Sequence, residues 1–273
     1  MPRELLLNVS MMIDILAVGC GVLVGFSLGL IGGGGSILAT PLLLYVVGVS
    51  QPHIAIGTSA LAVSANAFVN FAGHWRAGNV RWGNAIVFAA FGVLGAFGGS
   101  TLGKAFDGQR LIFLFAIIMV VVGVLMLRSG RKVGVDVAAL PPRAPAFSWK
   151  LAFVALAVGL LSGFFGIGGG FLIVPGLLFA TRMPLINAIG TSLFAVGAFG
   201  LATATNYALS GLVDWKIAGE YIVGGFFGGW LGMNLACRIA GHKSALNIIF
   251  AFVIFAVAAY MFYRTAGSWM RLT

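Results

Sequence analysis

Long apolar stretches recur along the chain and constrain its fold more than any other feature. Each is near the ~20 residues that a helix needs to cross the hydrocarbon of a bilayer. They lie at 11–31, 54–73, 85–103, 111–127, 187–209, 217–237 and 245–263. Because 60% of the residues are hydrophobic and only 8% are charged, a water-soluble fold could not bury this much apolar surface. The sequence therefore predicts an all-α polytopic membrane protein whose first partner is the lipid bilayer.

The charged residues and cysteines exclude several other classes of protein. The formal net charge is +10, but the basic residues are scattered through short connectors, so we expect no nucleic-acid partner. Cys20 and Cys237 lie in apolar stretches without a nearby second ligand, so we expect packing thiols and no metal site. No Ser/His/Asp set, HExxH motif or paired carboxylate is present. We therefore expect neither an enzyme nor a cofactor.

The chain repeats itself. Residues 29–44, GLIGGGGSILATPLLL, are echoed by residues 164–179, FFGIGGGFLIVPGLLF, with Pro41 matching Pro175. Downstream, Ala-Ile-Gly-Thr-Ser occurs at 55–59 and again at 188–192. Two copies in the same order indicate a duplicated architecture.

The repeats divide the chain into two units of about five helical segments each. We place the first transmembrane repeat at 11–128, a polar, Pro-rich cytoplasmic linker at 129–148, and the second transmembrane repeat at 149–264. An odd number of crossings per repeat would invert the second repeat, whereas an even number would give parallel repeats. Under inversion one side collects ten Lys and Arg and the other six. The positive-inside rule then predicts a cytoplasmic (inner) membrane protein with both termini outside.

The second segment of each repeat is too short to span comfortably. Segments 37–49 and 171–180 would be about 20 Å and about 15 Å long as helices, against a hydrocarbon core of about 30 Å. Short, Gly- or Pro-interrupted segments at matching places in two repeats point to a transporter binding site built from discontinuous helices. Whether these segments re-enter or cross the membrane stays open.

A glycine cluster precedes each short segment. A nucleotide phosphate loop is excluded, because no Lys followed by Ser or Thr comes after the last glycine. Bare glycine N–H groups at a helix start could instead bind an anion, although packing or turn formation explains them equally well. The candidate substrate contacts from these clusters are Gly33, Gly34, Gly35, Ser36, Gly168, Gly169 and Gly170.

A polar stripe follows on the next segment of each repeat. Ser59, Asn66, Asn70 and His74 are spaced by seven, four and four residues, which places them on one helical face. The equivalent face in the second repeat carries Ser192, Phe199, Thr203 and Tyr207, with Asn206 beside them. We expect Ser59, Asn66, Asn70, Ser192, Thr203 and Asn206 to contact a substrate, the alternative being hydrogen bonds between helices.

Acidic residues are scarce within the apolar stretches. Only Asp14 and Glu220 lie there, each near an end, so the sequence shows no carboxylate relay at the midplane. The glycine runs at 92–103 and 224–232 are expected to let helix backbones approach closely.

The glycine-rich clusters, the two prolines and the doubled Ala-Ile-Gly-Thr-Ser together resemble the TauE/SafE family of sulfite exporters and sulfonate permeases. The resemblance covers residues 15–264 and implies a transporter with inverted repeats that moves sulfur-containing anions. Its motifs fall on residues 32–35, 57–59, 166–170 and 190–192, which adds Thr58 and Thr191 to the candidate substrate contacts. Ile167 stands where the first copy has Gly33, so the two turns need not contribute equally.

The leading hypothesis is a secondary transporter that exports sulfite or an organosulfonate by alternating access. The competing hypotheses are a passive anion channel and an uptake permease for another small organic anion. The sequence leaves the choice of anion, the coupling ion and homo-oligomer formation open.

Overall fold

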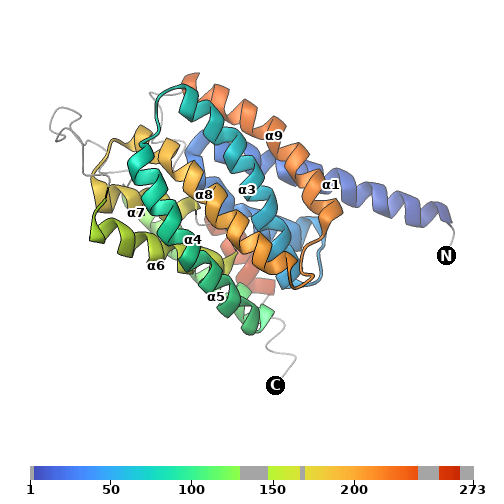
Figure 1. Cartoon of the computed structure of the whole chain (residues 1–273). Coiled ribbons are helices and arrows are strands. Elements are labelled where there is room, and N and C mark those ends of the chain that lie inside the picture. The colour runs from blue at the N-terminus through green and yellow to red at the C-terminus, as the bar shows by residue number, and fades with distance from the viewer. Residues whose placement is uncertain (1–2, 130–146, 167–169, 239–251, 265–273) are drawn as a thin grey trace.

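The computed structural model describes residues 3–129, 147–166, 170–238 and 252–264. Every regular element within these ranges is a helix (Figure 1), which confirms the all-α prediction. Backbone groups in lipid have no water to bond, and a helix satisfies them within one segment. Most of the predicted linker, residues 130–146, lies outside the described residues.

The helices follow the order expected from the apolar pattern. The first half contains α1 (Arg3–Ile31), η1 (Gly32–Leu38), α2 (Ala39–Leu42), η2 (Leu43–Val47), α3 (Pro52–Arg76), α4 (Trp82–Ala105) and α5 (Gly108–Ser129). The second half contains α6 (Trp149–Phe165), α7 (Gly170–Thr181), α8 (Leu185–Ala208) and α9 (Trp215–Arg238), and a further helical stretch covers 252–264.

Both segments that we predicted to be undersized are short in the structure. In the first half the chain passes from the 3-10 helix η1 through one turn of α-helix, α2, into the π-helix η2. In the second half, α7 has 12 residues and contains Pro175. By contrast, four stretches among the described residues are long and apolar enough to cross a bilayer: Ser10–Leu30, Pro52–Arg76, Trp82–Ala105 and Ile186–Ala208.

Helices from the two halves pair with one another. α1 packs along α9, α4 packs along α6, and α3 packs along α8. The turn between α3 and α4 lies at the opposite end of the bundle from the turn between α8 and α9 (Figure 1). Each half therefore depends on the other for its packing partners.

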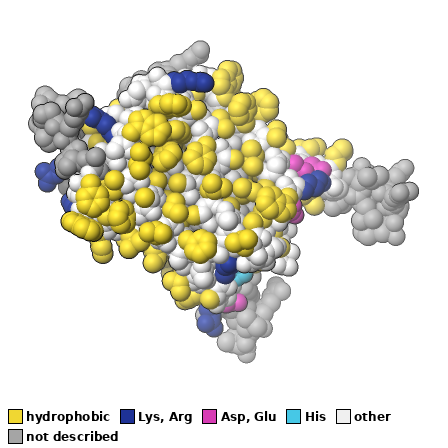
Figure 2. Space-filling model, in the orientation of Figure 1, with side chains coloured by type: hydrophobic (Ala, Val, Ile, Leu, Met, Phe, Trp, Pro, Cys, Tyr) yellow, Lys and Arg dark blue, Asp and Glu magenta, His cyan; other side chains and the backbone are white. Residues whose placement is uncertain are grey.

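The surface between the two ends of the bundle is apolar. Large side chains such as Leu94, Phe153 and Phe227 are more than half exposed, and hydrophobic groups cover much of the face in Figure 2. An exposed apolar surface of this extent is expected where the surrounding medium is lipid.

Glycines make the closest helix crossings possible. A methyl group at Gly25 of α1 would collide with the carbonyl oxygen of Gly225 on α9, and one at Gly159 of α6 would collide with that of Gly92 on α4. Small residues at such crossings let backbones touch and gain dispersion contacts. The predicted packing role of the glycine runs is thus confirmed, except that Gly98 faces open space.

We predict opposite effects for two alanine substitutions on α1. Gly25→Ala forces α1 away from α9 and should lower stability by about 1–3 kcal/mol, as overpacking does in protein cores. Gly19→Ala meets no atom within 4 Å and should gain up to ~1 kcal/mol from helix propensity. Thermal melts of the two purified variants in detergent test this, and a fall in Tm for both would contradict the assignment of the crossing.

Candidate functional site

The helices are interrupted at the two glycine clusters, and we call these interruptions the glycine-rich breaks: Gly32–Gly35 in the first half, and Gly166 and Gly170 in the described part of the second. The two breaks lie against each other. A methyl group at Gly33 in η1 would collide with the Cα of Gly170 at the start of α7, and one at Gly170 would collide with the carbonyl oxygen of Gly33. Ser36 donates a 2.9 Å hydrogen bond to the carbonyl oxygen of Gly33. Gly34 and Gly35 are buried, whereas two other predicted contacts, Gly168 and Gly169, lie outside the described residues. The breaks are therefore close-packed backbone in this conformation.

Each break is also held by an isoleucine from the other half. Gly32 and Gly166 adopt left-handed φ angles of +77° and +66°, which glycine adopts without strain. The side chain of Ile189 on α8 lies against Gly32, and that of Ile56 on α3 lies against Gly166. The isoleucine of each Ala-Ile-Gly-Thr-Ser copy thus packs on the break of the opposite half.

The threonines of the doubled motif bind the opposite half as well. The backbone N–H of Asp214, before α9, donates to Thr58 Oγ1 at 2.9 Å, and the N–H of Arg81, before α4, donates to Thr191 Oγ1 at 3.0 Å. Both threonines are fully buried. The structure therefore assigns Thr58 and Thr191 to holding a connector of the opposite half.

The serines next to these threonines bond within their own half. Ser59 Oγ donates to the carbonyl oxygen of Ile56 at 3.0 Å and lies 2.8 Å from Thr40 Oγ1. Ser192 Oγ donates to the carbonyl oxygen of Ile189 at 2.8 Å. These hydroxyls are satisfied without a ligand.

Asn206 also has its hydrogen-bonding groups occupied. Its Nδ2 donates to Ser100 Oγ at 2.6 Å and Thr101 Oγ1 at 2.9 Å on α4, and its Oδ1 accepts a 2.8 Å bond from Lys104 Nζ. Lys104 also donates to Ser210 Oγ at 2.8 Å. In this conformation Asn206 fastens α8 to the end of α4.

Two asparagines lie where α3 crosses the α1–α9 pair. The amide of Asn66 lies against Gly225, and the amide of Asn70 lies against Gly29 and Gly229. Both side chains are buried, with 0% and 2% of their surface exposed. Bare glycine backbone leaves the space in which these amides fit.

The Asn66 amide is unsatisfied. Neither its Nδ2 nor its Oδ1 has a hydrogen-bond partner among the described residues, whereas Asn70 Nδ2 donates to the Asn66 carbonyl oxygen at 2.9 Å. Burying such a group without a partner costs roughly 1–3 kcal/mol. In this conformation α3 therefore carries, near its middle, a buried amide without a partner among the described residues.

Other unsatisfied polar atoms lie on the same two helix faces. His74 Nδ1 on α3, and Thr203 Oγ1 and Tyr207 Oη on α8, are buried and have no partner within the described chain. The position equivalent to Asn66 is Phe199, which stacks on Phe88 with ring centroids 5.9 Å apart. The polar stripe predicted on α3 therefore has only a partial counterpart on α8.

The unpartnered polar groups on α3 and α8 are amide, imidazole and hydroxyl groups. In the part of the chain that the structure describes, no group of three His, Cys, Asp or Glu residues lies close enough to hold a metal ion. Amide, imidazole and hydroxyl groups on α3 and α8 can instead donate hydrogen bonds to oxyanion oxygens. They supply no fixed charge that would hold an anion too tightly.

Two features of this site could not be predicted from the sequence. Gly21, Gly25 and Gly29 are four residues apart on α1, and this spacing alone indicates a close crossing without naming α9 as the partner. Lys104 lies in the last turn of α4, where a basic residue is common, and its bond to Asn206 depends on the tertiary fold.

Comparison with known proteins assigns the chain to transporters. The sequence model of the family described as Sulfite exporter TauE/SafE matches residues 17–261. A "Probable membrane transporter protein" of Xylella fastidiosa (strain 9a5c) is 57% identical over 260 residues, covering 93% of this chain and 97% of the relative. The names describe transporters and not enzymes, as predicted.

More distant relatives carry names of the same kind. "Probable membrane transporter protein YunE" of Bacillus subtilis (strain 168) is 24% identical, covering 92% of this chain and 97% of the relative. "Sulfite exporter TauE/SafE family protein 6" of Arabidopsis thaliana is 34% identical over 112 residues, which cover 41% of this chain and 25% of the relative. No solved structure matches the chain.

We predict that the motif threonines stabilise the fold. Thr58→Val and Thr191→Val keep the side-chain shape and remove one hydrogen-bond acceptor each, which should lower stability by about 1 kcal/mol per substitution. Thr205→Val is the control, because Thr205 is exposed on α8 and should change little. Thermal melts in detergent measure all three, and wild-type Tm values for the two buried variants would contradict the role.

Proposed function

Because the chain belongs to the Sulfite exporter TauE/SafE family, we propose that this membrane transporter exports a small sulfur-containing anion, sulfite or an organosulfonate. The family description supports the substrate class, and the structure contributes the buried amide of Asn66, which has no hydrogen-bond partner among the residues described. We place the substrate between α3 and the α1–α9 crossing, where Asn66 and Asn70 lie against bare glycines.

Alternating access between two inverted repeats is the mechanism that we propose. The helix pairs α1–α9 and α4–α6 join the first segment of each repeat to the fourth segment of the other, as a two-fold relation between repeats would require. The α3–α4 and α8–α9 turns lie at opposite ends (Figure 1), which supports inversion. Rocking of one repeat against the other would expose Asn66 to each side in turn.

The close contact between the glycine-rich breaks fits a carrier better than an open channel. Gly33 and Gly170 touch through backbone atoms, so an anion could pass between them only after the breaks separate. We therefore propose that the breaks part as the repeats move and that their N–H groups then become available to the anion.

A transport assay in liposomes tests this function. Purified protein should move sulfite or a small sulfonate faster than protein-free liposomes, with saturation and with acceleration by unlabelled substrate on the far side. Acceleration of this kind requires a carrier that returns loaded, so its absence together with ion-channel currents would favour the passive channel. Failure to move any sulfur oxyanion or sulfonate would overturn the proposed function.

We predict that Asn66→Leu separates transport from stability. Leucine is close in shape and removes a buried unsatisfied amide, so Tm should stay equal or rise, while loss of the ligand contact should lower kcat/KM at least about tenfold, equivalent to ~1.4 kcal/mol.

Phe199→Leu, at the equivalent position of α8, is the matched control. It removes ring contacts with Phe88, so it should lower Tm and leave kcat/KM nearly unchanged. An Asn66→Leu protein with wild-type transport would remove Asn66 from the substrate site.

A further inference from the structure

The two ends of the bundle differ in charge. The end with the α3–α4 turn carries four described cationic side chains, Arg76, Arg81, Lys150 and Arg182, and no described carboxylate. The opposite end has four cations and four carboxylates: Lys104, Arg110, Lys216, Arg264, Asp14, Asp107, Asp214 and Glu220. Figure 2 shows basic side chains without acidic ones at the upper left, and both kinds at the right and lower edges.

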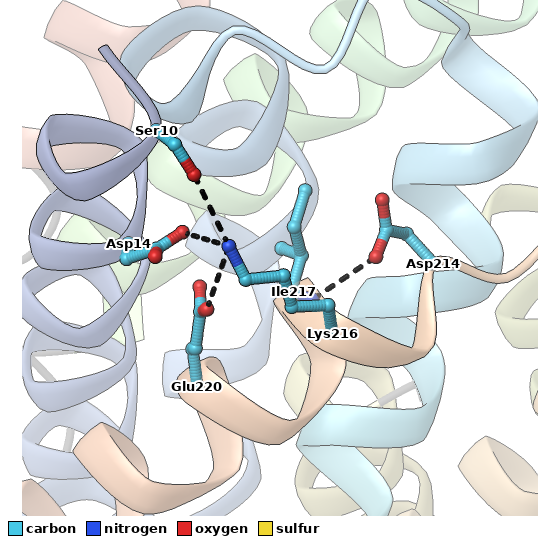
Figure 3. A network of polar contacts seen from close by, with 6 residues as sticks. All are labelled: Ser10, Asp14, Asp214, Lys216, Ile217 and Glu220. Carbon is cyan, nitrogen blue, oxygen red and sulfur yellow. Dashed lines mark hydrogen bonds and ion pairs between the residues drawn. The ribbon is translucent and has the colours of Figure 1, made fainter. Parts of the chain in front are cut away.

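At the mixed end, cations are neutralised directly. Lys216 Nζ lies 2.6 Å from a carboxylate oxygen of Asp14 and 3.7 Å from one of Glu220, and Figure 3 shows both groups converging on the ammonium. Within the described chain, none of the arginines at the other end has such a pair. Lys150 donates to the Phe179 carbonyl oxygen at 2.8 Å, so three of the described cations at that end, Arg76, Arg81 and Arg182, carry guanidinium groups without an ion pair.

At one pair of equivalent positions, Arg81 and Asp214, the same backbone environment carries side chains of opposite charge. Asp214 and Arg81 each precede a helix, α9 and α4, and each donates its N–H to an equivalent threonine. Asp214 also accepts a 3.0 Å bond from the N–H of Ile217, as an acidic residue favours at a helix start. Arg81 forms no side-chain bond to its helix and repels the positive end of the helix dipole. Stability alone would favour an acidic residue there.

A second position carries arginine against a backbone preference. Where the short segment of the first half ends, Gly48 has a φ of +86°; where that of the second half ends, Arg182 has a φ of +54°. Glycine adopts this left-handed conformation freely, whereas other residues are strained in it. Arg182 is exposed, so packing does not explain why arginine stands there.

The charged end connects to the unsatisfied polar groups. Going inward along α3 from Arg76, His74, Asn70 and Asn66 lie at helical spacings on one face. His74 Nδ1 and both polar atoms of the Asn66 side chain are buried without partners among the described residues. A polar line thus runs from the charged end to the proposed substrate site.

From these observations we infer that the end bearing Arg76, Arg81 and Arg182 is the loading mouth, which captures a small anion before it moves along α3. The inference rests on the proposed function, because it requires an anionic substrate. A positive field that no described carboxylate offsets raises the local concentration of anions and speeds their capture. The positive-inside rule places this end in the cytoplasm, but it does not require carboxylates to be absent, since Asp and Glu contribute little to orientation.

The loading mouth can be tested by replacing an arginine with the residue found at the equivalent position of the other half, a change that the fold should accept. Arg81→Asp reproduces the helix start at Asp214, and Arg182→Gly reproduces the left-handed Gly48. Both should preserve or raise Tm, because each relieves an unfavourable local interaction. The control is Arg110→Gln with Arg264→Gln, which removes two cations from the mixed end.

Sulfite uptake into phosphatidylcholine liposomes is then measured as ionic strength is varied. The Arg81→Asp/Arg182→Gly protein should lose about fivefold in kcat/KM at low salt, with kcat nearly unchanged, and the difference should shrink to about twofold or less near 0.5 M salt as charges are screened. The control should stay within about twofold of wild type at every salt concentration.

The outcomes separate the inference from the proposed function. A wild-type protein that moves no sulfur anion overturns both. A wild-type protein that transports, beside an Arg81→Asp/Arg182→Gly protein with unchanged kcat/KM at low salt, overturns the loading mouth alone. Phospholipid headgroups share the chemistry of the substrate, so the comparison is repeated with anionic lipid added. An effect that appears only with anionic lipid assigns the arginines to headgroup binding and also overturns the mouth.

Discussion

Close backbone contact between the two halves is the constraint on which the rest of the structure depends. Lipid offers helices no hydrophobic reason to associate, so α1–α9 and α4–α6 hold together through glycine faces that bring backbones into contact. The same bare surfaces leave room for the amides of Asn66 and Asn70. Glycine at Gly225 and Gly229 therefore serves both purposes: the backbone of α1 approaches these residues closely at Gly25 and Gly29, and a side chain at either position would collide with the Asn66 or Asn70 amide.

The doubled Ala-Ile-Gly-Thr-Ser motif shows how a repeated sequence can serve the fold. Ile56 and Ile189 pack on the glycine turn of the opposite half, and Thr58 and Thr191 accept an N–H from its connector. Within each motif the neighbouring serine bonds its own helix. Each copy of the motif therefore binds the opposite half, and these reciprocal contacts are a structural reason for its presence in both halves.

Much of this architecture could be predicted from the sequence, because lipid imposes simple rules on length and polarity. Apolar stretches near 20 residues gave the long helices, and the short segments beside the glycine clusters were recognised from their length. The partners of each helix could not be predicted, since the glycine spacing on α1 fits any small-residue face. Asn66 and Asn206 looked alike as buried amides, yet only the tertiary fold supplies Asn206 with Ser100, Thr101 and Lys104. It leaves the Asn66 amide without a partner in the described part of the chain.

The connector between η2 and α3 differs in length from its counterpart in the second half. Pro41 and Pro175 are 134 positions apart, whereas Gly57 and Gly190 are 133 apart, so the first half holds one additional residue between these points. Gly48 and Arg182 are also 134 positions apart, so the additional residue lies after Gly48, in the connector that leads to α3. That connector has four residues, 48–51, whereas its counterpart before α8 has three, 182–184. The helices on both sides keep their register with the other half, so this connector absorbs the difference in length without disturbing the pairing of the two halves.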